Sequence, residues 1–129
     1  MRPVLLLVFS LLLAALLPGA GPLAAHHSMS MYDLDRQITL TGAVVNFGWE
    51  NPHAQVVFEV KRDNGTTEKW TADCPSPRRL SRVGWTKDSL KPGDPITITG
   101  NQAKDGSNVM RLDRVLLSTS QELDGYSRR

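Results

Sequence analysis

The chain opens with a hydrophobic run that limits how much of it can fold into a domain. Residues 4–17 read VLLLVFSLLLAALL, in which Ser10 is the only polar residue, and Arg2 precedes them. Such a run fits the core of a secretory signal peptide and is short for a membrane-spanning helix of about 20 residues. Residues 18–25 (PGAGPLAA) break the helix and supply small residues for cleavage. We therefore expect a signal peptide over residues 1–25 and export to the periplasm or the medium, the alternative being an uncleaved anchor.

Cleavage after Ala25 would leave a mature chain that begins His26-His27-Ser28 and has about 100 residues, the size of one small domain. This size excludes a two-domain enzyme. No cysteine lies near the cleavage region, so we expect no lipid anchor and no stable membrane attachment after processing. The 15 Lys and Arg nearly balance the 13 Asp and Glu, so the chain lacks the field that nucleic-acid binding requires.

From residue 37 onward the chain shows the alternation of polar and apolar residues that is typical of β-strands. Ile38 and Leu40 alternate with threonines, and the apolar parity changes at Gly42. A glycine at such a change indicates a β-bulge or a sharp bend within one long strand. Further strands are expected over residues 54–61, 67–72, 96–99 and 109–117.

Two local signals show how these strands are connected. Asn64-Gly65 is a strong signal for a tight hairpin between the second and third strands. Ser76 followed by Pro77 suits the start of a helix, and Gly84 is placed to end it. The order is therefore strand, strand, strand, helix, strand, strand, which is that of the five-stranded barrel of the oligonucleotide/oligosaccharide-binding (OB) type.

The predicted fold is thus mainly β, a small five-stranded OB-like barrel over residues 37–118 with one short helix between strands three and four. A small β-sandwich, or another small barrel with a loop helix, is the alternative. An extended N-terminal arm over residues 26–36 and a flexible tail over residues 119–129 would flank the barrel. The expected core consists of Leu40, Val44, Val56, Phe58, Val60, Trp70, Leu80, Ile96, Ile98 and Leu112.

Cys74 is the only cysteine, so it has no partner for a disulfide within the chain. We expect it to be a small buried hydrophobic residue. A disulfide between two chains, or a role as a soft metal ligand, is the alternative.

Several short motifs occur together in the part of the chain that is expected to be exported. They are His26-His27-Ser28, Leu40-Thr41-Gly42, Trp49, Asn51-Pro52-His53, Ser76-Pro77, Gly84-Trp85-Thr86-Lys87-Asp88-Ser89-Leu90-Lys91-Pro92-Gly93-Asp94 and Lys104-Asp105-Gly106-Ser107. With this combination, over roughly residues 26–118, the chain resembles a family of small exported bacterial proteins classed as a domain of unknown function. The resemblance implies a single exported domain and assigns no activity. The chain departs from the family at Met29 and Met31, where an aromatic is usual, and at Cys74, where glycine is common.

The placement of the three histidines points to a metal site. A chain that begins at His26 offers its α-amine and its imidazole as a chelating pair, and a distant ring such as His53 can supply a third nitrogen. Such a set suits copper(II), while the thioethers of Met29 and Met31 favour copper(I). His27 is an assisting candidate, because its side chain is expected to point away from its neighbour's. The alternative is that these side chains are solvated or packed and hold no metal.

Trp49 and Trp85 lie near the expected loops and are candidates for a ligand-binding surface. They carry the alternative function, a non-catalytic OB-type module that binds a peptide, a saccharide or a partner protein without metal. The sequence contains no nucleophile elbow, no His-Glu-x-x-His, no phosphate-binding loop and no paired zinc cysteines. We therefore expect a binding protein, with an unidentified protein or small ligand as partner, and not an enzyme.

Overall fold

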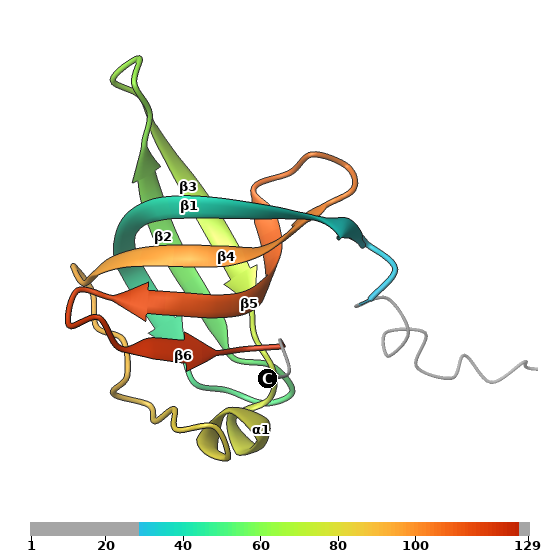
Figure 1. Cartoon of the computed structure of the whole chain (residues 1–129), viewed down its shortest axis with the longest axis vertical. Helices are drawn as coiled ribbons and strands as arrows, with labels where there is room; N and C mark the ends of the chain where they lie inside the picture. The colour runs from blue at the N-terminus through green and yellow to red at the C-terminus, as the bar shows by residue number, and fades with distance from the viewer. Residues whose placement is uncertain (1–28, 127–129) are drawn as a thin grey trace, which may run out of the picture.

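Six strands and one short helix make up the part of the chain that the computed structural model describes, residues 29–126. The hydrophobic run, the expected signal peptide and the histidines at positions 26 and 27 lie outside it. Figure 1 shows the elements in chain order, which are β1 (Tyr32–Gly48), β2 (Gln55–Lys61), β3 (Thr67–Asp73), α1 (Pro77–Ser81), β4 (Pro95–Ala103), β5 (Val109–Leu117) and β6 (Glu122–Asp124).

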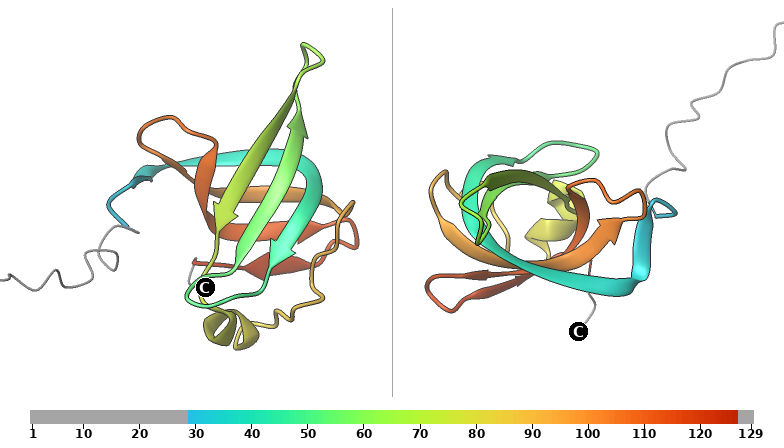
Figure 2. Two further views of the ribbon diagram at one scale, coloured as in Figure 1. Left: turned by 180° about the vertical axis from the view of Figure 1, so that it is seen from behind. Right: turned by 90° about the horizontal axis from the view of Figure 1, so that it is seen from above.

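The first five strands close into a barrel. Neighbouring strands follow the order β3-β2-β1-β4-β5, and a parallel pairing between β3 and β5 completes the ring. The view from above in Figure 2 shows the strands encircling the core, with α1 at the far end. The predicted mainly β barrel, with one short helix between strands three and four, is therefore confirmed.

Strand β1 is long enough to pair with two neighbours in turn. Its residues from Gln37 to Ala43 pair with β4, and those from Ala43 onward pair with β2. Gly42 lies at this change of partner, where a Cβ atom would come within 2.2 Å of the Glu59 carbonyl oxygen. Glycine is thus required by the close approach of two backbones. The β-bulge itself lies slightly later, between Val44 and Asn46.

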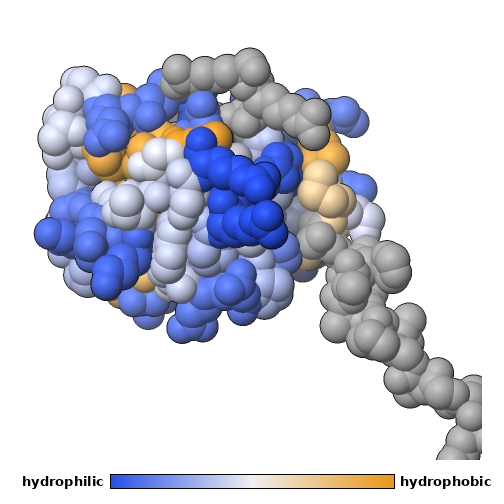
Figure 3. Space-filling model, turned by 90° about the horizontal axis from the view of Figure 1, so that it is seen from below, coloured by the Kyte–Doolittle hydropathy of each residue, from blue (hydrophilic) through white to orange (hydrophobic). Residues whose placement is uncertain are grey.

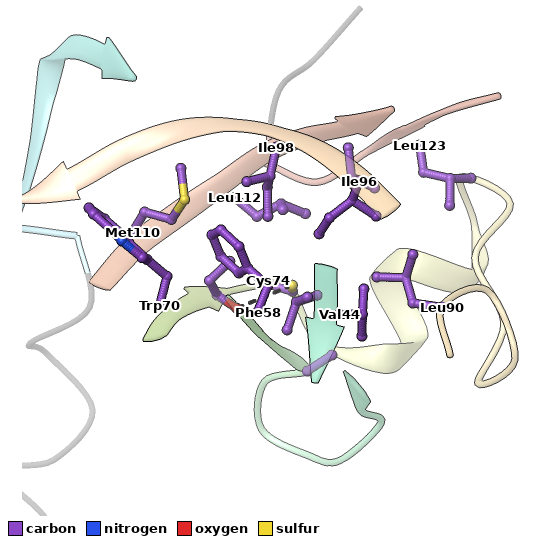
Figure 4. Packing of buried hydrophobic residues seen from close by; sticks show 14 of the residues in the cluster. Val44, Phe58, Trp70, Cys74, Leu90, Ile96, Ile98, Met110, Leu112 and Leu123 are labelled. Carbon is purple, nitrogen blue, oxygen red and sulfur yellow. Dashed lines mark hydrogen bonds between the residues drawn. The ribbon is translucent and has the colours of Figure 1, made fainter. Parts of the chain in front are cut away.

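The inward-facing residues of the strands form one core (Figure 4). Phe58, Ile98 and Leu112 have no exposed surface, and Figure 4 shows Trp70 and Met110 toward one end of the cluster and Leu90 toward the other. The predicted core is confirmed apart from Leu40, which is only partly buried.

Cys74 lies inside this core with none of its surface exposed (Figure 4). Its sulfur donates to the Ala72 carbonyl at 3.6 Å, and burial raises the pKa of its thiol. The alternatives of a disulfide between chains and of a soft metal ligand are therefore wrong, because both require the sulfur to reach the surface or a site.

The two predicted flanking segments are shorter than expected. Strand β1 begins at Tyr32 rather than at Gln37, so residues 32–36 of the predicted arm belong to the sheet. The buried ring of Tyr32 and the side chain of Asn101 hold this irregular start in place, since the Asn101 amide donates to the Asp33 and Arg36 carbonyls at 2.9 Å each.

The predicted flexible tail is also corrected, because residues Glu122–Asp124 pair with β5 as strand β6. Leu123 is buried, and the amide of Gly125 donates to the Asp113 carbonyl at 2.6 Å. A single inward leucine was too weak a pattern to predict a strand from the sequence.

Helix α1 covers one end of the barrel through Leu80, its only buried residue. Ser76 caps its first turn, as predicted, by accepting a hydrogen bond from the Arg79 amide at 3.4 Å. Arg78, Arg79 and Arg82 are exposed, and Figure 3 shows this end as a mainly hydrophilic surface. Within residues 29–126, no helix is long and apolar enough to cross a membrane.

Candidate functional site

A pocket of about 220 Å³ lies where β3 and β5 meet to close the barrel. Five separate segments converge on it, namely the start of β1, the start of β2, the end of β3, β5 and the residues after β6. Its lining residues are Met29, Tyr32, His53, Gln55, Asp73, Arg111 and Tyr126.

The carboxylate of Asp73 is held by two hydrogen-bond donors in this pocket. Gln55 pairs with Asp73 across the β2–β3 ladder, and its Nε2 donates to Oδ1 at 2.7 Å. The hydroxyl of Tyr32 donates to Oδ2. Both donors are neutral groups, so they orient the carboxylate without cancelling its charge.

Tyr32 is fixed in its protonated form. Burial raises the pKa of its hydroxyl far above the ordinary value, and the Asp73 carboxylate raises it further. A phenol in this state keeps its proton throughout the neutral range and remains a hydrogen-bond donor to Asp73.

Arg111 and Tyr126 also line the pocket. The Arg111 guanidinium lies 4.3 Å from the centre of the Tyr126 ring, a distance suited to a cation–π contact. Its Nη1 donates to Asp113 Oδ1 at 2.7 Å, and the Nε is buried without a hydrogen-bond partner within residues 29–126. The Tyr126 hydroxyl donates to the Cys74 carbonyl at 3.1 Å. Arg111 is thus directed toward Asp113, although its paired residue across the β3–β5 seam is Asp73.

The two ion pairs formed in the described part of the chain, Arg62–Glu68 and Arg111–Asp113, do not include Asp73. The pocket combines a half-buried carboxylate with a guanidinium, an imidazole, an amide, a thioether and two phenols. Carboxylate, imidazole and thioether are all groups that bind metal ions.

The structure brings together two of the five predicted metal ligands. Met29 and His53 both line the pocket, and both are exposed at its mouth. Met31 is exposed and is not part of the lining. His26 and His27 lie outside the described residues. Within residues 29–126, no three His, Cys, Asp or Glu side chains gather closely enough to hold a metal by themselves.

The predicted ligand surface is corrected at Trp85, which is 2% exposed. Its indole nitrogen donates to the Asp124 carbonyl at 2.8 Å, and its ring packs against Phe47 at 5.6 Å between centroids. The segment after α1 turns back beneath the barrel, so a tryptophan expected at a loop edge becomes core. Trp49 is half-buried, with its ring edge against Phe47 at 5.7 Å, and it does not line the pocket.

Sequence reasoning missed most of the pocket. Tyr32, Gln55, Asp73, Arg111 and Tyr126 carry no motif and come from distant parts of the chain. The one available signal was that several of them stand at or next to the ends of expected strands, where polar side chains can gather.

Comparison with known proteins supplies no activity. No curated protein matches the sequence. The model of a family of unknown function (DUF6152) matches residues 14–111, from within the hydrophobic run to the third residue of β5. Because this match covers most of the chain, the protein belongs to that family of unknown function.

Proposed function

We propose that this chain is a small exported protein that binds copper at the pocket, through His53, Met29 and the N-terminal His26 of the processed chain. One observation carries the proposal. The sequence predicts His53 as a nitrogen ligand and Met29 as a thioether ligand. These two residues line the same pocket although they are far apart in the chain.

The chain connectivity supports a third ligand from His26. His26 stands three positions before Met29, and three extended residues span at most about 10 Å. The amine and imidazole of a chain that begins at His26 are therefore within reach of the pocket. His27 is available as an assisting imidazole, and the exposed Met31 as a second thioether near the same site.

The chemistry of this ligand set favours copper. An amine and two imidazoles suit the tetragonal geometry of copper(II), which has the highest affinity in the divalent series. The α-amine has a pKa of about 7.7–8.0, so a metal ion displaces its proton near neutral pH. The His53 ring and the thioethers of Met29 and Met31 add further ligands.

The test uses the protein purified after export, with its first residue established by intact mass. Copper(II) is titrated against a competing chelator, and the electron paramagnetic resonance (EPR) spectrum is recorded. We expect His53→Ala to weaken binding at least about tenfold and to change the nitrogen hyperfine pattern. An unchanged affinity and spectrum in His53→Ala would overturn the proposal.

A matched control addresses the terminal amine, because any N-terminal histidine peptide binds some copper(II). Acetylation of the α-amine removes it as a ligand and leaves every residue in place. We expect the acetylated protein to lose affinity to a similar degree, and His27→Ala to lose less. A mature chain that begins elsewhere than at His26 would also contradict the proposal.

The alternative function, a metal-free module that binds a peptide, saccharide or partner protein, now has to use Trp49 without Trp85.

A further inference from the structure

We infer that the end of the barrel covered by α1 binds the surface of anionic phospholipid bilayers reversibly, through three arginines and the exposed side chain of Val83. The arginines are Arg78, Arg79 and Arg82. None of these four residues lines the pocket, so binding here goes beyond the proposed function and does not depend on it. The contact implies no anchor, since the arginines meet lipid headgroups and only one apolar side chain enters the bilayer.

The fold of this segment places Val83 on the outside. Leu80 is buried beneath α1. Gly84 has a φ of +95° and reverses the chain, so that the Trp85 amide donates to the Leu80 carbonyl at 3.1 Å and the Trp85 ring is buried. Val83 stands between these two buried residues and is 49% exposed. An apolar side chain is thus held in solvent by a turn that is fixed on both sides.

The three arginines form a local excess of positive charge next to Val83. Spacings of three and four residues place them beside Val83 on the outer side of the helical turn, where all are exposed. Residues 74–87 contain no Asp or Glu, and neither ion pair formed within residues 29–126 includes these arginines. Arg79 lies 5.5 Å from the centre of the Tyr126 ring, a contact that positions its guanidinium without cancelling the charge. Such a surface attracts an anionic partner.

The shape of this end favours an extended partner. Helix α1 lies at one end of the barrel and the β2–β3 hairpin at the other (Figure 1). The view of the α1 end in Figure 3 shows strongly hydrophilic surface with apolar surface beside it. The arginines also line neither of the two larger depressions elsewhere on the described surface. Small anions and other small ligands bind in concave sites, whereas a projecting surface suits a layer of anionic groups.

Val83 distinguishes a bilayer from other extended anions. A bilayer presents phosphate groups above hydrocarbon, so guanidinium groups can pair with phosphate while a neighbouring apolar side chain enters the boundary beneath. An acidic peptide would use the charges and leave Val83 in water. Each basic residue close to an anionic membrane surface strengthens binding about fivefold, so three together contribute about a hundredfold.

The experiment measures sedimentation of the exported protein with lipid vesicles, in the presence of a chelator so that metal ions play no part. Vesicles of phosphatidylcholine and phosphatidylglycerol in equal parts are compared with vesicles of phosphatidylcholine alone. We expect binding to the anionic vesicles only, and its loss in about 1 M salt, where the Debye length is about 3 Å. Replacement of all three arginines by glutamine should weaken binding about a hundredfold. Val83→Thr, which keeps the shape of the side chain, should weaken it at least about threefold.

Two matched controls change the same chemistry elsewhere on the surface. Leu34→Thr alters a side chain at the start of β1 that is as exposed as Val83, at 49%, and should bind as the wild type does. A second triple variant removes the same net charge from exposed lysines on β2, on β3 and after β4, and should lose far less affinity than the arginine variant. Its substitutions are Lys61→Gln, Lys69→Gln and Lys104→Gln.

The outcomes are separable from those of the copper experiment, because His53→Ala should bind vesicles as the wild type does. Equal binding to neutral and anionic vesicles, or equal losses in the arginine and lysine variants, would overturn the inference. Binding to polyglutamate but not to vesicles would assign this surface to an acidic protein instead. Folding of each variant is checked by near-ultraviolet circular dichroism. Should the arginine variant fail to fold, Val83→Thr decides, and vesicle binding equal to that of Leu34→Thr refutes the bilayer contact.

Discussion

Substitution of Gly42 by alanine tests the feature that lets β1 serve two neighbours in the barrel. An added Cβ would lie 2.2 Å from the Glu59 carbonyl oxygen and 3.3 Å from the Phe58 ring. The first contact is with backbone, so no rotation of a side chain relieves it. Strands β1 and β2 have to separate locally, at the Ala43–Glu59 pair that follows the change of partner.

The expected cost follows from this geometry. Overpacking of a folded interior costs about 1–3 kcal/mol when side chains or backbone adjust. We expect Gly42→Ala to lie at the upper end of that range, about 3 kcal/mol, because the atom to be moved belongs to the strand ladder. That is a large part of the stability of a small domain, about 5–15 kcal/mol.

Gly48 is the matched control on the same strand. A Cβ at this position would lie 3.8 Å from the Gln55 carbonyl oxygen, an ordinary contact, and its φ is not in the left-handed region. Gly48→Ala reduces the number of conformations open to the unfolded chain, so it should raise the free energy of unfolding by about 0.4–1 kcal/mol. Both variants are unfolded in urea and followed by tryptophan fluorescence, with the slope m compared to verify a common unfolded state. A difference between them of less than about 1 kcal/mol would refute the close-approach argument.

Two further predictions concern buried groups. Trp85→Ala should lower the free energy of unfolding in urea by about 3–5 kcal/mol and Trp49→Ala by clearly less, because Trp85, unlike Trp49, is buried and its indole donates to a carbonyl. Equal losses in the two variants would contradict this. Burial raises the pKa of the Cys74 thiol from an ordinary value near 9, so above pH 9 the folded state retains a proton that the unfolded state loses. The free energy of unfolding should therefore fall as the pH rises from 9 to 10, by up to about 1.4 kcal/mol per pH unit. A Cys74→Ala variant whose free energy of unfolding falls with the same slope would show the reasoning to be wrong.

The barrel was predictable because its strands follow local rules. Alternation assigns each side chain to one face, so Phe58 and Ile98 were placed in the core before any contact was known. The Asn64-Gly65 turn and the Ser76 cap each depend on a few neighbouring residues, and both occur where the sequence indicated. The parity change at Gly42 likewise marked the region where β1 changes partner.

The rest depends on contacts between distant segments. Trp85 and Leu123 become core only because the chain after α1 and the chain after β5 return to the barrel. A tryptophan beside a turn gives no local sign of which surface will cover it. Tyr32 belongs to the sheet for the same reason, since its burial comes with a hydrogen bond to Asp73 far along the chain.

The proposed copper site divides its ligands between a rigid frame and a chain end, and this division has a physical consequence. His53 lies two residues before β2, whose first residue, Gln55, pairs with Asp73 at the end of β3, so the β2–β3 ladder forms one wall of the pocket. Within residues 29–126, no three His, Cys, Asp or Glu side chains could hold a metal together, and the proposed site therefore includes the histidine at position 26. The α-amine proposed to complete the set would exist only after removal of the expected signal peptide, because in the precursor that nitrogen is part of a peptide bond. In this scheme the barrel forms half of the site by folding, and processing supplies the other half.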